Sequence, residues 1–172
     1  RQRLAATGNS THGYFGGGAN EPGSSIYSTV DKITYASDTS AAVPGAALNG
    51  ARYSLAATGN STAGYFGGGD VTGDGASNSV TKMEKVTYAS DTTAAVPGAN
   101  LIQNRKRLAA TGNSTHGYFG GGGLPGSYSS IEKTTYSTDT TAAVPSGADL
   151  SGSRTDVAAT GARANALPEF PP

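Results

Sequence analysis

The chain has 172 residues, and its twelve basic and twelve acidic residues give a formal net charge of zero. Binding to a phosphate backbone needs a positive field, and no basic stripe supplies one, so nucleic acid is not expected as a partner. The absence of cysteine excludes disulfide bonds, thiolate catalysis and most zinc sites, and apolar triplets such as Ala-Ala-Val are too short for membrane insertion.

One phrase, Leu-Ala-Ala-Thr-Gly-Asn-Ser-Thr-His-Gly-Tyr-Phe-Gly-Gly-Gly at 4–18, returns with small changes further along the chain. Its tyrosine recurs after 51 and then 53 residues. A chain that repeats itself this closely is built from one supersecondary unit used several times. We therefore expect three units, 1–51, 52–106 and 107–161, and a proline-rich tail, 162–172, that serves as a linker or docking peptide.

Each unit is expected to contain four short strands, here taken in order along the middle unit. The first strand covers 52–58 and ends at Gly-Asn, and the second covers 64–67 and ends in glycines. The third covers 79–88 and alternates clearly, and the fourth covers 92–96 and ends at Pro-Gly. Four strands in about fifty residues are typical of a β-propeller blade, so the sequence predicts an all-β propeller fold.

The units differ in length between the triple glycine and the second tyrosine, where turn-forming residues follow no shared order. These segments are predicted to be surface loops, which is where function usually varies. Tyrosine and acidic side chains that converge at one rim can hold a glycan or a protein surface; the candidates are Glu21, Tyr27, Asp70, Asp74 and Tyr128. The alternative is that the loops simply tolerate sequence drift.

The second loop resembles the start of a calcium-binding loop. Asp70, Thr72 and Asp74 supply oxygen atoms at the first, third and fifth positions, and Gly75 stands at the sixth. The acidic residue expected at the twelfth position is replaced by Thr81. The alternative is a polar hairpin turn, and no other cofactor is expected.

Asn-Ser-Thr occurs once in each unit, at Asn9, Asn60 and Asn113. Each is an N-glycosylation acceptor if the chain passes through a eukaryotic secretory route. The alternative is a turn in which the asparagine and serine side chains cap backbone groups.

Catalysis is not expected. His12 and His116 share one repeat position, but Ala63 replaces them in the middle unit, and no carboxylate or nucleophile accompanies them at a fixed spacing. The triple glycines lack the Lys-Ser or Lys-Thr of a phosphate-binding loop, so close strand packing and sharp turns explain them better. We therefore expect both histidines to be surface turn residues and not catalytic groups.

The order of these features resembles a kelch repeat, which has a double glycine, a tyrosine about one strand later and an arginine near the next unit. The matching positions are Arg3, Arg52, Arg107 and Arg154 for the arginine, 16–17, 67–68 and 120–121 for the glycines, and Tyr35, Tyr88 and Tyr136 for the tyrosine. The chain has no kelch tryptophan and places Val43, Val96 and Val144 nearby.

The wording of the repeat further resembles kelch-like structural proteins of tailed bacteriophages, notably those that infect cyanobacteria. The resemblance implies a non-enzymatic structural or binding module on the surface of a virion or tail fibre, and thus an extracellular location. The alternative is a kelch-type protein-interaction domain of a cellular or secreted protein. A glycan-cleaving propeller enzyme would require a recurring carboxylate pair, which the repeat lacks.

Three blades do not close a propeller, because known propellers have four to eight. Open sheet edges invite pairing with another chain. We therefore expect the ring to be completed by more chain or by a homo-oligomer, such as a dimer with six blades.

Overall fold

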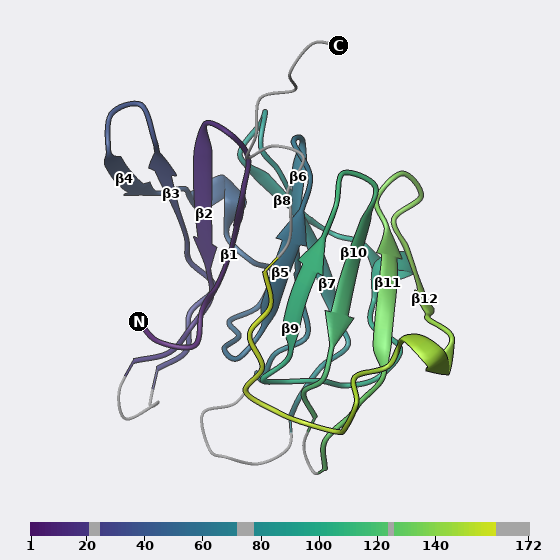
Figure 1. Cartoon of the computed structure of the whole chain (residues 1–172). Helices are drawn as coiled ribbons and strands as arrows, with labels where there is room; N and C mark the ends of the chain where they lie inside the picture. Colours follow the sequence, from purple (N-terminus) through teal and green to yellow (C-terminus); the bar gives the residue numbers. More distant parts are fainter. Residues whose placement is uncertain (21–24, 72–77, 124–125, 161–172) are drawn as a thin grey trace, which may run out of the picture.

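The computed structural model describes residues 1–20, 25–71, 78–123 and 126–160. In these residues the expected all-β fold is confirmed, since twelve strands form three four-stranded antiparallel sheets (Figure 1). Within each sheet the strands follow one another in sequence order. The first sheet holds β1 (Ala5–Gly8), β2 (His12–Gly16), β3 (Val30–Thr34) and β4 (Thr39–Ala42).

The second and third sheets repeat this arrangement. The second holds β5 (Ala56–Gly59), β6 (Ala63–Gly67), β7 (Met83–Thr87) and β8 (Thr92–Ala95). The third holds β9 (Ala109–Gly112), β10 (His116–Gly120), β11 (Ile131–Thr135) and β12 (Thr140–Ala143).

The helical elements of the described residues are three single 3-10 turns, each of which follows the last strand of a sheet. They are η1 (Pro44–Ala46), η2 (Pro97–Ala99) and η3 (Ser146–Ala148). In the first two, proline enters the turn directly and stops the preceding strand. No helix in the described part of the chain is long and apolar enough to cross a membrane.

The four strands expected in each unit are confirmed in number and order, but two strands of the middle unit begin later than expected. The first strand of the middle unit begins at Ala56 rather than 52, because Ser54 has a positive φ of 56° that interrupts extended backbone. The third begins at Met83 rather than 79, and its expected start makes only an isolated bridge between Asp70 and Ser79.

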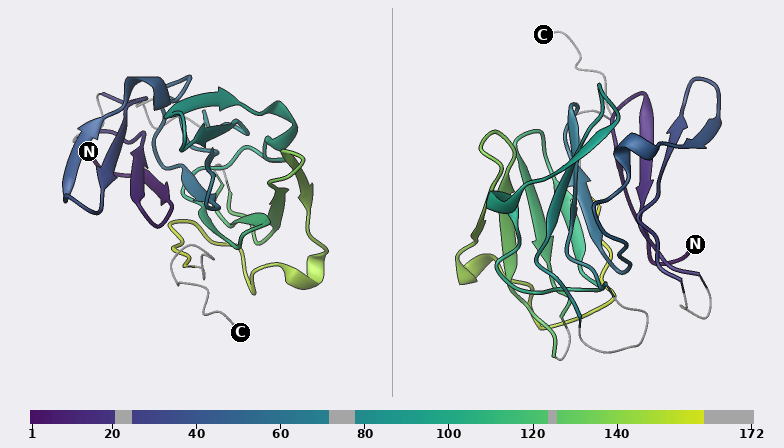
Figure 2. Two further views of the ribbon diagram at one scale, coloured as in Figure 1. Left: turned by 90° about the horizontal axis from the view of Figure 1, so that it is seen from above. Right: turned by 180° about the vertical axis from the view of Figure 1, so that it is seen from behind.

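Successive sheets stand side by side with their first strands adjacent, as the end-on view of Figure 2 shows. The Thr7 hydroxyl of β1 donates to the Thr58 carbonyl of β5 at 3.1 Å. The first strands are rich in alanine and glycine, and these small side chains allow the close approach.

One hydrophobic cluster fills each of the two spaces between sheets. Phe66 of the second sheet is fully buried against Gly16 of the first, and Phe119 of the third sheet is fully buried against Gly67 of the second. A Cβ atom at Gly16 would lie 2.7 Å from the Phe66 ring, and one at Gly67 would lie 2.9 Å from the Phe119 ring. The first glycine of the first two triplets is therefore needed for close packing, which supports the structural interpretation of these triplets.

A polar network repeats beside each cluster. In the first space, the Tyr14 ring stacks on Tyr88 at 4.9 Å, and its hydroxyl donates to Asp91 at 2.6 Å. Lys32 forms an ion pair with the same carboxylate at 2.6 Å. In the second space, the same contacts join Tyr65, Tyr136, Asp139 and Lys85. The contact between sheets is thus one unit used twice.

The arginine register of the resemblance is wrong at two positions. Arg1, Arg52, Arg105 and Arg154 each stand three residues before the Leu/Val-Ala-Ala-Thr-Gly run, whereas Arg3 and Arg107 stand one residue before it. Arg3 and Arg107 have positive φ angles of 56° and 58°. They are therefore equivalent to Ser54 rather than to Arg52.

Candidate binding surface at the loop end

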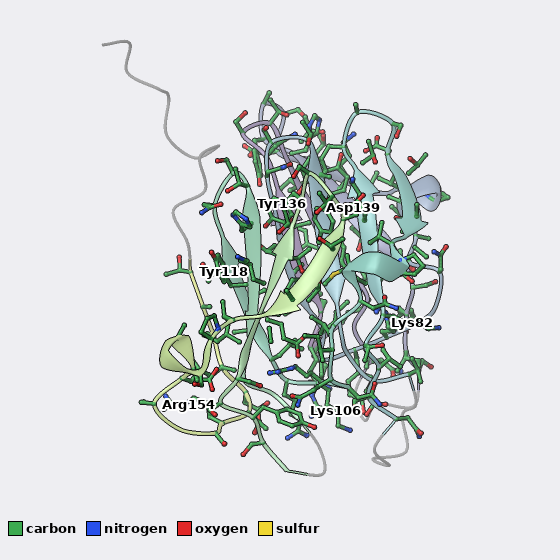
Figure 3. All side chains as sticks on the ribbon, turned by 90° about the vertical axis from the view of Figure 1, so that its right-hand side faces the viewer. Lys82, Lys106, Tyr118, Tyr136, Asp139 and Arg154 are labelled. Carbon is green, nitrogen blue, oxygen red and sulfur yellow. The ribbon has the colours of Figure 1, made fainter. Side chains whose placement is uncertain are left out.

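The three segments of variable length join the second and third strands of each sheet, and their described ends all lie at the same end of the molecule. The arrowheads of β2 and β10 point toward this loop end in Figure 1. Figure 3 shows Lys106 and Arg154 at this end of the third sheet, with Tyr136 and Asp139 at the opposite end. A single face of the molecule therefore carries the part of the repeat that varies most.

An arginine that precedes the first strand of each sheet is hydrogen-bonded to both ends of that sheet's variable loop. The Arg105 Nη1 donates to the carbonyls of Gly121 at 2.8 Å and Ser130 at 2.9 Å. The Arg52 Nη1 makes the same pair of bonds to Gly68 at 3.0 Å and Lys82 at 2.9 Å. Arg1 repeats the arrangement on Gly17 and Thr29.

A buried carboxylate balances each of the two buried arginines. Arg52 lies 3.1 Å from Glu84, and Arg105 lies 2.8 Å from Glu132. Burial lowers the pKa of Arg52, and the charge and hydrogen bond of Glu84 oppose that shift. Because both partners are buried and paired, the loop ends are held in one position while the residues between them are free to differ.

The structure contradicts the exposed position expected for Asp70. Asp70 is fully buried, and its carboxylate forms an ion pair with the buried Lys106. Its backbone bridges Tyr53 and Ser79, which holds it inside the loop base. This carboxylate therefore does not belong to an exposed rim, and a calcium ion there would have to compete with the ammonium group.

The remaining calcium candidates, Thr72 and Asp74, lie outside the described residues, as does the rim candidate Glu21. Within the described residues, no group of three or more histidine, aspartate or glutamate side chains is placed to hold a metal ion.

The two rim tyrosines are brought to the loop end and lie next to the anchoring arginines. The Arg105 guanidinium lies 4.9 Å from the centre of the Tyr128 ring, and the Arg1 guanidinium lies 5.9 Å from that of Tyr27. Both tyrosines are half-buried. Stacking on an immobilised cation fixes the orientation of each ring while part of it remains accessible.

The structure reveals a hollow at the loop end that the sequence did not indicate. It has a volume of about 240 Å³ and lies where the starts of the first strands meet. Its polar lining comes from one repeat position, which is occupied by Arg3, Ser54, Arg107 and Asp156. We call it the inner-strand hollow.

Backbone hydrogen bonds join these four residues into a chain. The N–H of Ser54 donates to Arg3 at 2.7 Å, that of Arg107 to Ser54 at 2.8 Å, and that of Asp156 to Arg107 at 2.9 Å. All four have φ between 56° and 58°, a left-handed conformation that residues other than glycine rarely adopt. Such conformations are frequent at binding sites.

The hollow carries two guanidinium groups and one carboxylate. Arg107 lies 3.4 Å from Asp156, whereas Arg3 lies over the Tyr53 ring at 5.8 Å. The lining thus has a net positive charge and can receive an anionic group. The sequence does contain a signal for this hollow, namely a polar residue directly before each Leu-Ala-Ala run. The signal was missed because Arg3 and Arg107 were aligned with Arg52 instead of with Ser54.

The opposite end of the sheets holds the three asparagine turns. The Asn60 Oδ1 accepts hydrogen bonds from the backbone N–H groups of Thr62 at 2.9 Å and Ala63 at 3.0 Å. Asn9 and Asn113 cap their turns in the same way. The capping alternative for these asparagines is therefore confirmed, while their glycosylation stays a prediction.

The two histidines begin β2 and β10 at this same opposite end. Each ring Nδ1 lies 2.8 Å from the hydroxyl of the preceding threonine, Thr11 or Thr115. Neither histidine lies at the loop end with the variable segments.

Comparison with protein-family models and with curated proteins finds no match to this chain.

Proposed function

We propose that the chain is a non-enzymatic binding module built from kelch-like propeller blades, and that its loop end recognises a glycan or protein on a host surface. The resemblance of the repeat to structural proteins of tailed phages supports the proposal that the module belongs to a virion or tail fibre, outside the cell. The remaining blades of the ring would come from more chain or from a second subunit.

The observation that carries this proposal is the constant anchor beneath variable loops. Arg52 and Arg105 each hold both ends of a loop through an equivalent pair of bonds to backbone carbonyls, although the loops differ in length and sequence. A rigid frame that presents variable loops on one face is the usual arrangement of a recognition surface.

The chemistry of the loop end favours a glycan that carries a carboxylate. Tyr27 and Tyr128 offer partly exposed rings on which a sugar can stack. Arg3 and Arg107 supply planar donors that suit a carboxylate, and the inner-strand hollow lies between them.

The test is a screen of the full chain against an array of neutral and acidic oligosaccharides, followed by titration of the best binder. Arg3→Ser is a well-matched variant, because Ser54 already occupies the equivalent position with the same backbone conformation. Arg3→Ser and Tyr128→Ala are each expected to weaken binding about tenfold, which corresponds to about 1.4 kcal/mol. His116→Ala is the control, because Ala63 occupies that position in the second sheet.

Binding that survives both loop-end variants, or that falls equally in His116→Ala, would contradict the proposal. Binding to host surface protein and to no oligosaccharide would assign the same loop end to the alternative, a kelch-type protein-interaction surface. Turnover of an oligosaccharide would contradict the non-enzymatic role.

A further inference from the structure

The contact between neighbouring sheets occurs twice inside the chain, between the first and second sheets and between the second and third. Each contact has two different sides, or halves, and one copy of each half is left uncovered, one on the third sheet and the other on the first. The third sheet presents the half that the first and second sheets use to receive their neighbour. The first sheet presents the half that the second and third sheets insert. The two unused halves are therefore complementary by construction.

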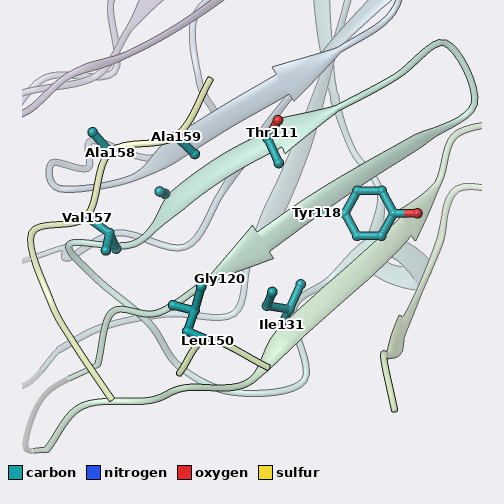
Figure 4. A pocket seen from close by; sticks show the side chains of 9 residues that line it. Thr111, Tyr118, Gly120, Ile131, Leu150, Val157, Ala158 and Ala159 are labelled. Carbon is teal, nitrogen blue, oxygen red and sulfur yellow. The ribbon is translucent and has the colours of Figure 1, made fainter. Parts of the chain in front are cut away.

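The receiving half on the third sheet contains an apolar hollow of about 100 Å³ (Figure 4). It is lined by Gly120, Ile131, Leu150 and Val157, among others. Gly120 is equivalent to Gly16 and Gly67, which receive the rings of Phe66 and Phe119. The hollow is thus the space that a phenylalanine fills at both internal contacts.

The polar groups beside this hollow are the Tyr118 hydroxyl and the Lys133 ammonium group. Tyr118 and Lys133 are equivalent to Tyr14 and Lys32, which share the Asp91 carboxylate at 2.6 Å. Among the described residues, neither the Tyr118 hydroxyl nor the Lys133 ammonium group has a hydrogen-bond partner. Tyr118 is partly exposed, whereas Tyr14 is fully buried.

The inserting half on the first sheet is correspondingly uncovered. Phe15 is 40% exposed, whereas its equivalents Phe66 and Phe119 are fully buried. Tyr35 is 48% exposed, whereas its equivalents Tyr88 and Tyr136 are 7% and 6% exposed. Asp38 occupies the position of Asp91 with the same left-handed backbone, at φ 51° against 52°.

The geometry points to a second copy of this chain as the partner of the third sheet. The first sheet of the second copy inserts Phe15 into the hollow at Gly120 and stacks Tyr35 on Tyr118. Its Asp38 accepts hydrogen bonds from Tyr118 and Lys133. The contact so formed reproduces the two internal contacts in packing, in hydrogen bonds and in charge.

One segment of the chain has to move for this docking. Residues 154–160 lie along β9 in the place of a further first strand, where the Asp156 N–H donates to Arg107 at 2.9 Å and Thr111 donates to Thr160 at 2.8 Å. The incoming β1 makes these bonds instead and arrives already paired with β2. Its Leu4 is also larger than Val157, so it fills the space beneath the inner-strand hollow better.

Because every copy carries both halves, two copies meet twice and give a ring of six sheets. That number lies within the four to eight blades of known propellers. The inference rests on the propeller arrangement proposed above and on no property of the ligand. Failure to bind a glycan would therefore leave it standing.

The first test is the mass of the full chain by sedimentation velocity as its concentration is raised. The result expected is twice the 17.0 kDa of one chain. Phe15→Ala and Lys133→Glu should each weaken association about tenfold or more, since each removes one element of the contact. Lys82→Glu is the control, because this exposed lysine makes the same charge change away from both halves.

The second test is a disulfide between copies. At the internal contact, a Cβ built at Gly117 lies 2.5 Å from the Thr58 Cγ2 atom, so a cysteine pair at these positions is in bonding range. The equivalent pair between copies is Gly13→Cys with Thr111→Cys, in a chain that has no other cysteine. Oxidation is expected to give covalent dimers.

A chain that stays at 17.0 kDa at every concentration would overturn the inference. So would a dimer that is indifferent to Phe15→Ala and Lys133→Glu, or the absence of cross-linked dimers. If the double-cysteine variant loses its circular dichroism spectrum, the sedimentation series decides alone.

Discussion

The three equivalent phenylalanines make a direct test of the contact between sheets. Phe119 is fully buried against Gly67 and Met83, and Phe66 is fully buried against Gly16. Truncation of a buried phenylalanine to alanine costs about 3–5 kcal/mol, because the lost burial is joined by a cavity that the neighbours fill only in part. We expect a loss in this range for Phe66→Ala and for Phe119→Ala.

Phe15 provides the matched control, because it occupies the same repeat position without a neighbouring sheet and is 40% exposed. Its truncation should lower the unfolding free energy by about 1 kcal/mol, since much of the ring contacts solvent already. The assay is urea unfolding followed by circular dichroism, at a protein concentration low enough to keep the chain monomeric. Equal losses in all three variants, or a loss below about 1 kcal/mol for Phe119→Ala, would refute the packing described here.

In the monomer at neutral pH, Asp91→Asn should lower the free energy of unfolding by about 1–2 kcal/mol, whereas Asp38→Asn should change it little. Burial raises the pKa of Asp91, but hydrogen bonds from its lysine and tyrosine partners outweigh it and leave the pKa below 3.8. The ionised Asp91 carboxylate therefore stabilises the fold above pH 3.8, and this stabilisation is lost as the pH falls below that value. The difference in unfolding midpoint between the unmodified chain and Asp91→Asn should accordingly shrink only below pH 3.8 when the midpoint is measured as a function of pH. Arg105→Met leaves the Glu132 charge buried and unpaired, so urea unfolding should show a loss of about 3–5 kcal/mol, and a neutral result would contradict the anchor. Asn60→Ala removes the cap of its turn and should cost about 1–2 kcal/mol in thermal unfolding, and an unchanged midpoint would show that the turn does not need it.

The number and order of the strands could be predicted because they depend on signals close together in the sequence. Gly-Asn, the triple glycine, Ser-Asp and Pro-Gly end the strands of the middle unit, and the third strand alternates clearly. These signals recur at equivalent positions in each unit, so each unit independently supports the same strand assignment. The strand starts were less predictable. The left-handed backbone at Ser54 shortens β5, but a positive φ is usually recognised in a sequence by a glycine, and this position has a serine.

The candidate site was only partly predictable, because its contacts join residues far apart in the sequence. The tyrosines at 27 and 128 lie at the loop end, since loop position follows from local turn signals, while their role in binding stays a prediction. Asp70 is buried in an ion pair with Lys106, which stands 36 positions later, just before the first strand of the third sheet. The inner-strand hollow likewise needs one residue from each successive unit, and that neighbourhood follows from how the sheets pack.

The most direct measurement is the state of an engineered cysteine pair between the second and third sheets, Thr58→Cys with Gly117→Cys. A Cβ at position 117 lies 2.5 Å from the Thr58 Cγ2 atom, so the two thiols should form a disulfide within one chain on mild oxidation. Peptide mapping by mass spectrometry is expected to find residues 58 and 117 linked in the monomer, with Thr58→Cys alone as the unlinked control. If both thiols stay free in the folded protein, the sheets do not pack as described, and the proposals built on their repeated contact fail with it.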